Sequence, residues 1–131
     1  MIWNVIDTVD LFHTGTGERD WLIHLCREGI LAIPAGAADP AGSTIDEGGA
    51  QPIEDQGDPQ WMRFPLAELG SVVVRQRFLA GSRLMINTAD GDQHKFSTDS
   101  LPATGRARRK LSTVYPNLYR EEKFTKPAGP D

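Results

Sequence analysis

The sequence predicts a mainly β domain of the α+β class, in which about seven antiparallel strands precede one amphipathic helix near the C-terminus. Three observations predict it: short apolar segments recur along the chain, turn residues separate them, and the apolar spacing becomes helical after residue 100. The 131 residues are 39% hydrophobic, which is enough for a single core and excludes disorder throughout. We expect one domain over residues 1–119 and a flexible tail over residues 120–131.

The first quarter of the chain predicts three antiparallel strands. Residues 2–13 are rich in strand-forming residues and end at Thr14-Gly15-Thr16-Gly17, whose glycines suit a tight reversal. Residues 20–28 and 30–34 are two further apolar runs, and the Gly29 between them can serve as a bulge or turn.

Residues 35–60 differ in composition and predict a long, mobile, acidic loop. These 26 residues contain five glycines, three prolines and six acidic residues, but no basic residue. Such a segment buries too little apolar surface to offset the entropy lost on ordering. Ile45 and Ile53 are its large apolar residues, and we expect them to anchor it locally.

The next segment predicts further strands around a short helical turn. Residues 61–65 form a short strand halted by proline, and residues 66–69 form the turn. Residues 71–79 alternate between two faces, which places Arg75 and Arg77 in solvent.

Two more strands complete a three-stranded meander. Residues 80–82 turn the chain into a strand at residues 83–88. Asp90-Gly91, a strong hairpin signal, turns it again into a strand at residues 93–98.

The apolar period then becomes helical. Asp99 or Ser100 can cap the helix, Pro102 suits its first turn, and we expect it to end near Tyr115, because a residue before proline (here Pro116) is pushed out of the helical region. The residues spaced to line its apolar side are Leu101, Ala107, Leu111, Val114 and Leu118. The opposite side is basic and carries Arg106, Arg109 and Lys110.

Charge is divided unevenly along the chain. Residues 1–60 carry a net charge of −9 and residues 61–131 carry +5, which together give the overall −4. This division predicts either a charged partner surface or two parts of one fold that attract each other. A pI near 5.3 disfavours nucleic acid as a partner.

The compartment and chemistry are constrained mainly by what the sequence does not contain. No apolar run approaches the roughly 20 residues of a membrane span, and the first eleven residues carry no basic residue of a signal peptide. Cys26 is the single cysteine, so no internal disulfide forms and we expect a cytoplasmic protein. No phosphate-binding glycine motif occurs, and we expect no cofactor.

One pair of residues allows an enzymatic alternative. His24 and Cys26 are two residues apart on a predicted strand, so they share a face and could form a thiolate–imidazole pair or two metal ligands. A small hydrolase or metal enzyme would use this pair with an acidic residue of the loop. The competing interpretation is that both side chains are packed in the core, as cysteine usually is.

The order of elements resembles that of the pleckstrin-homology-like superfold, and the chain resembles its bacterial members or the related GRAM domains. The segments that carry the likeness are WLIHLCREGILAIP, FPLAELGSVVV and RLMINTADGDQHKF, within about residues 18–115. The resemblance implies a bent, partly open barrel plugged at one end by the helix, and a role in protein or lipid binding. Phosphoinositide binding is not implied, because Arg19 is the single basic residue of the first turn.

A group of basic residues is the strongest candidate for a binding surface. Arg75 and Arg77 share a strand face, and a patch that holds an anion or an acidic partner forms if the helix cluster adjoins them. The alternatives are a solvated face or a docking site for the chain's own acidic loop. We expect a non-enzymatic module that binds an acidic or amphipathic protein segment beside residues 71–79 or on the basic face. The predicted partner-binding residues are Arg75, Arg77, Arg106, Arg109 and Lys110.

Two further possibilities stay open at this point. The basic face of the helix could instead attach the protein peripherally to an anionic membrane. The sequence also leaves a homo-oligomer open.

Overall fold

The structure, a computed structural model, describes residues 2–14, 20–34, 51–76 and 81–122. One helix, α1 (Leu101–Val114), and one short 3-10 turn, η1 (Leu66–Glu68), accompany the strands of these ranges. The strands are β1 (Ile2–His13), β2 (Asp20–Cys26), β3 (Gly29–Pro34), β4 (Gln51–Glu54), β5 (Met62–Pro65), β6 (Leu69–Gln76), β7 (Ser82–Thr88), β8 (Gln93–Thr98) and β9 (Tyr119–Glu122). The predicted mainly β fold with seven strands and a C-terminal helix is therefore confirmed, and β4 and β9 are additional.

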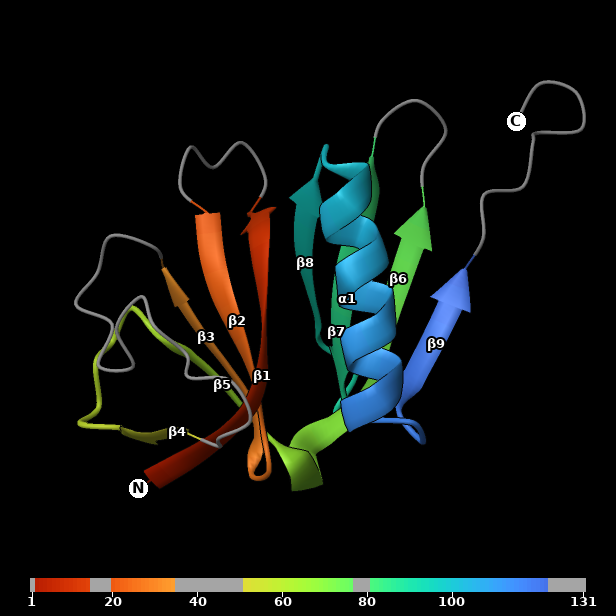
Figure 1. The fold of residues 1–131 in the computed structure, drawn as a ribbon. Coiled ribbons are helices and arrows are strands. Elements are labelled where there is room, and N and C mark those ends of the chain that lie inside the picture. Colours follow the sequence, from red (N-terminus) through yellow and green to blue (C-terminus); the bar gives the residue numbers. More distant parts are fainter. Residues whose placement is uncertain (1, 15–19, 35–50, 77–80, 123–131) are drawn as a thin grey trace, which may run out of the picture.

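The strands form one bent sheet in the order β5-β3-β2-β1-β8-β7-β6-β9, with β4 also paired to β1. Neighbours are antiparallel except β6 and β9, which are parallel. Strands β1 and β8 meet at one residue pair, His13 with Ser97, so the two halves of the sheet diverge away from it. Helix α1 contacts β1 of one half and β6, β8 and β9 of the other, and in Figure 1 it lies in front of β7. The fold is therefore a partly open barrel covered on one side by a helix.

Helix α1 seals the main core, as its apolar spacing predicts. The Ser100 side chain caps the helix by accepting a hydrogen bond from the Ala103 amide at 3.1 Å. Residues Ala103, Ala107 and Leu111 are buried against both halves of the sheet. The prediction for Leu101 was wrong: it is the first residue of α1, lies outside this core and is 61% exposed. Within the described residues, no helix is long and apolar enough to cross a membrane.

Tyr115 ties the end of α1 to the turn between β2 and β3. Its buried hydroxyl lies 2.8 Å from the carbonyl oxygen of Cys26 and 2.7 Å from that of Gly29. Gly29 has a φ of 139°, and a Cβ there would lie 2.1 Å from the Phe64 carbonyl oxygen, so the turn requires glycine.

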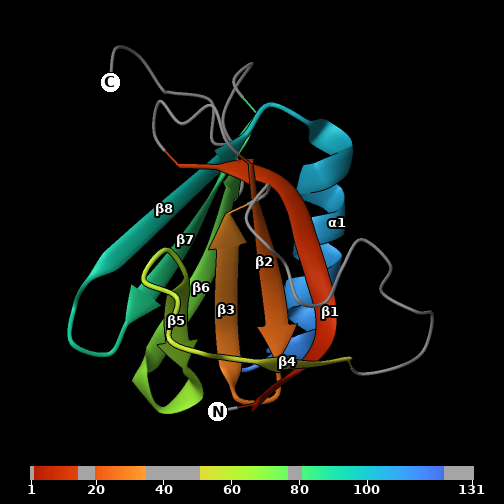
Figure 2. The same cartoon turned by 90° about the vertical axis from the view of Figure 1, so that its left-hand side faces the viewer.

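A second apolar cluster covers the outer face of β1, β2 and β3. It joins Trp3, Leu31 and Cys26 of this sheet to Ile53 of β4 and to Trp61. Figure 2 shows the segment that carries β4 crossing this face. Residues 51–54 were predicted to be loop, and this prediction was wrong. They form a strand because they pair with β1 and because the Ile53 side chain is buried. Ile53 is an anchor as predicted; Ile45 and the rest of residues 35–50 lie outside the described residues.

An ion pair fixes the end of this covering segment. The Arg63 guanidinium donates to the two carboxylate oxygens of Asp55 at 2.5 and 2.7 Å, and the Trp3 indole donates to Asp55 at 3.1 Å. The Arg63 hydrogen bonds are the largest influence on the pKa of Asp55 and hold it well below its usual range. The last part of the predicted acidic loop is therefore a structured cover rather than a mobile segment.

Candidate functional site

The basic residues of α1 point to two different sides of the helix. On the side of β1, the Arg106 guanidinium lies 3.6 Å from the Asp10 carboxylate, and the Lys110 ammonium lies 3.3 Å from that of Asp7. Lys110 also donates to the carbonyl oxygen of Thr8 at 2.7 Å. These contacts join the basic second half of the chain to the acidic first half, which is the attraction that the uneven charge predicted.

On the other side of α1, the basic residues contact β9. Arg108 pairs with Glu121 and donates to the Gln76 side chain at 3.4 Å. Arg75 of β6 donates to Glu122 at 2.6 Å. The acidic end of β9 therefore lies between a basic helix and a basic strand.

Strand β9 occupies the edge of β6 beside α1. The chain turns after Tyr115, and the Tyr119 amide donates to the Tyr115 carbonyl oxygen at 2.9 Å. It then runs parallel to β6, from Val72 opposite Tyr119 to Arg75 opposite Glu122. Residues 120–122 were predicted to belong to a flexible tail, and this was wrong because the β6 edge and two ion pairs hold them. The segment after Glu122 lies outside the described residues.

The structure does not gather the predicted partner-binding residues into one open patch. Arg75 lies at the β9 edge, whereas Arg106 and Lys110 lie beside β1. Arg109 is exposed between these two sides, and its guanidinium forms no ion pair with the described residues. Arg77 lies outside the described residues. The contacts that sequence reasoning missed are those of Arg108, which was left out of the predicted set although it pairs with β9.

The alternative site at His24 and Cys26 is buried. The His24 Nδ1 atom lies 2.9 Å from the Thr8 hydroxyl oxygen, and the Cys26 thiol donates to the His24 carbonyl oxygen at 3.6 Å. Burial, with a smaller effect from the charge of Glu28, raises the pKa of Cys26 to about 12, so the thiol stays protonated at neutral pH. Among the residues that the structure describes, no three His, Cys, Asp or Glu side chains converge as metal ligands.

Comparison with known proteins identifies a fold but no sequence family. No family model matches the sequence, and no curated protein matches it. A solved structure described as that of the Spt16D Pob3N heterodimer superposes with a TM-score of 0.56 over 99% of this chain, at 8% sequence identity. The fold is pleckstrin-homology-like. This chain spans 59% of the length of that neighbour, and at such low identity the likeness extends to the fold alone.

Proposed function

We propose that the protein is a non-enzymatic binding module that docks an acidic, extended segment of a partner protein along β6. The observation that carries the proposal is the pairing of β9 with β6 within the chain itself. An extended segment pairs with the β6 edge, and its carboxylates at Glu121 and Glu122 meet Arg108 and Arg75. Addition of a strand to a sheet edge is a common mode of peptide recognition, in which main-chain hydrogen bonds supply affinity and side chains supply specificity.

The β6 edge together with Arg75 and Arg108 is the binding slot of this proposal, and β9 binds it weakly enough for a partner to compete. It is a strand of four residues at the edge of the sheet. The Arg75 and Glu122 side chains are 48% and 46% exposed, and ion pairs with such exposure contribute only about 0.2–1 kcal/mol each. A partner segment that adds contacts beyond these four residues can therefore take the place of β9.

The comparison with solved structures is consistent with a protein partner. The neighbouring structure is described as a heterodimer, so its fold occurs in a protein–protein complex. The acidic character of the partner in our proposal comes from Arg75 and Arg108 in this chain. We include in the proposal the cytoplasmic setting that a single buried cysteine favours, and the resemblance to bacterial members of the superfold.

The test uses the chain's own segment as the probe. In the 131-residue variant Glu121→Lys/Glu122→Lys, β9 carries cations toward Arg75 and Arg108 and should leave the β6 edge. A fluorescent synthetic peptide spanning residues 116–122 should then bind about tenfold more tightly than to the wild type, measured by anisotropy, because about 1.4 kcal/mol of competition is removed. The matched control is Asp20→Lys/Glu54→Lys, which makes the same charge change at two exposed residues elsewhere.

Two further arms decide whether the slot itself binds the probe. Adding Arg75→Gln/Arg108→Gln to the Glu121→Lys/Glu122→Lys variant should abolish the gain, because the peptide carboxylates then have no cationic partner and no new ion pair to β9 is created. A peptide with both glutamates replaced by lysine should not bind the opened chain. Equal peptide affinity for the wild type and the opened variant would refute the proposal.

A further inference from the structure

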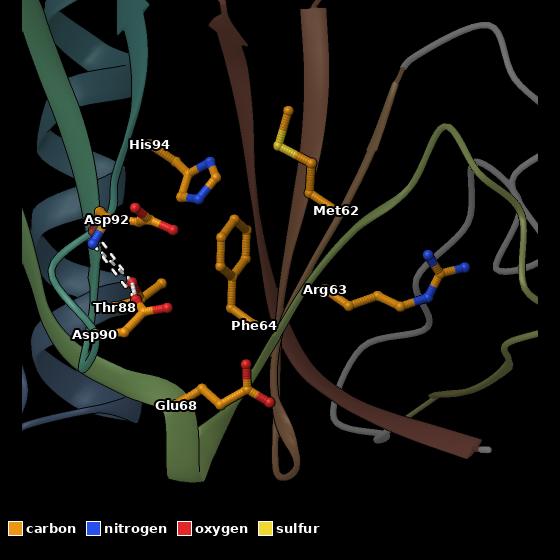
Figure 3. A pocket seen from close by; sticks show the side chains of 8 residues that line it. All are labelled: Met62, Arg63, Phe64, Glu68, Thr88, Asp90, Asp92 and His94. Carbon is orange, nitrogen blue, oxygen red and sulfur yellow. Dashed lines mark hydrogen bonds between the residues drawn. The ribbon is translucent and has the colours of Figure 1, made fainter.

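A cavity of about 260 Å³ lies at the opposite edge of the sheet from β9. It is bounded by β5, the last strand of one half of the sheet, and by the hairpin of β7 and β8 from the other half (Figure 3). The backbone joins these elements through η1, since the Ala89 amide donates to the Glu68 carbonyl oxygen at 2.7 Å. The cavity therefore opens where the two halves of the sheet diverge.

The inner wall of the cavity is apolar and aromatic. The Phe64 ring on β5 packs edge-on against the His94 ring on β8, with centroids 4.9 Å apart and planes inclined at 69°. Figure 3 shows the Met62 side chain on β5 to one side of these rings. This wall suits the methylene groups of a long side chain.

The rim of the cavity is negative. Glu68, Asp90 and Asp92 are exposed there, and none of them forms an ion pair within the described part of the chain. The Thr88 hydroxyl donates to the Asp90 carboxylate, which lowers the pKa of Asp90 and keeps it ionised.

Arg63 is the one lysine or arginine among the residues that line the cavity, and it is held away from the rim. The Arg63 guanidinium is bound by Asp55 and lies over the Trp61 ring, 5.7 Å from its centroid. In Figure 3 it points away from Phe64 and His94. A ligand that enters the cavity therefore meets carboxylates and aromatic groups.

We propose that this cavity binds the side chain of a lysine or arginine presented by a partner protein on an extended segment. The methylene groups would lie against Met62 and Phe64, and the cationic end would reach Glu68 and Asp92 at the rim. Small-molecule sites typically have volumes of about 300–1,000 Å³, so this cavity has the size for one long side chain rather than a larger ligand. A protein is the source that the surroundings favour, because β5 is an edge strand beside which a partner backbone can lie.

This inference is independent of the proposed function, because it concerns the other sheet edge and the opposite charge. The two sites would allow the domain to bind an acidic segment at β6 and a basic segment at β5.

The experiment follows backbone amide signals of the ¹⁵N-labelled full chain by NMR. The probes are lysine and arginine blocked at both backbone ends, with blocked norleucine as the control that lacks the charge. Both cationic probes should cause saturable shifts at Phe64, Glu68 and Asp92, and norleucine should bind at least about tenfold more weakly. Shifts no larger than those from sodium chloride at equal ionic strength would overturn the proposal.

A peptide arm distinguishes a protein source from a free amine. A short extended peptide with one central lysine should bind more tightly than blocked lysine and should also shift the amides of residues 62–64 on β5. The same peptide with norleucine in place of lysine should not bind. Tighter binding of the free diamine cadaverine than of the peptide would contradict a protein source.

Variants then test the rim. Glu68→Gln/Asp92→Asn should weaken binding of the lysine peptide about tenfold, because it removes two of the three carboxylates. The matched control, Asp20→Asn/Asp99→Asn, loses the same charge at two exposed residues away from the cavity. It should bind the lysine peptide with the affinity of the wild type. All four side chains are exposed, so the spectra of both variants should stay those of a folded chain. Equal weakening in both variants would show that general charge, rather than the cavity, attracts the peptide.

Discussion

Removal of one hydroxyl group, by Tyr115→Phe, tests whether the end of α1 is fixed to the sheet as the structure shows. The Tyr115 side chain is buried, and its hydroxyl supplies one proton to two carbonyl oxygens at 2.8 and 2.7 Å. Loss of a buried donor leaves these acceptors without this partner, at a cost of about 1–3 kcal/mol. Because one proton is shared, we expect a loss of about 1–2 kcal/mol in the free energy of unfolding and a melting temperature lower by roughly 3–8 °C.

Urea unfolding monitored by tryptophan fluorescence measures this loss. Tyr119→Phe is the comparison variant, because the Tyr119 hydroxyl is buried without an acceptor among the described residues and has only Arg108 near enough to affect its pKa. It should change the free energy of unfolding by less than about 0.5 kcal/mol. If Tyr115→Phe is as mild as Tyr119→Phe, the hydroxyl does not fix the helix, and the reasoning fails.

Three further predictions concern the core, the covering segment and the buried thiol. Leu111→Ala should lower the free energy of unfolding in urea by about 3 kcal/mol, because this fully buried side chain fills the space between the two halves of the sheet; a loss below about 1 kcal/mol would contradict a helix that seals the core. Because Arg63 lowers the pKa of Asp55 in the folded state, their pairing should stabilise the fold above the unfolded pKa of about 3.9 and lose effect as pH falls below it. The difference in the free energy of unfolding between Asp55→Asn and the wild type, measured in urea, should therefore become smaller below about pH 4. A difference that does not change with pH would contradict a stabilising pair. Cys26 should not react with Ellman's reagent in the folded chain at pH 8 but should react at once in urea; rapid reaction in the folded chain would contradict its burial.

Where neighbouring residues alone determine an element, the sequence predicted it correctly. Ser100 and Pro102 mark the start of α1, and a β-hairpin forms around Asp90-Gly91, where Gly91 has a φ of 100°. Residues 71–79 were predicted to alternate between two faces, and Val72 and Val74, on the face opposite Arg75, both lie in the core. In each case capping, turn geometry or side-chain period acts over a few residues, so the signal is present in a short window.

The two strands that sequence reasoning missed depend on distant partners. Strand β4 has one large apolar residue, Ile53, and its order comes from pairing with β1 and from the contact of Asp55 with Arg63. Strand β9 is the polar segment Tyr119–Glu122, which has no apolar alternation and is held by β6 and by two arginines. Local composition carries no information about such pairings.

The same reason limits what could be predicted of the sites. The basic residues were found by counting charges, but the acidic partners of Arg106 and Lys110 lie about a hundred residues away on β1. The cavity at the other edge brings together Phe64, Glu68 and His94 from three separate elements, and none of these carries a motif. The charge division along the chain was the one signal that indicated contacts between its halves.

The central claim is that the edge of β6 is a binding slot that β9 fills, and a disulfide tests it most directly. Val73 and Arg120 are register partners on β6 and β9, so Val73→Cys/Arg120→Cys can lock β9 in place, while Cys26 stays buried. In the Glu121→Lys/Glu122→Lys chain, the peptide of residues 116–122 should bind the reduced form and not the oxidised form, as measured by anisotropy. Equal binding to both forms would contradict the claim.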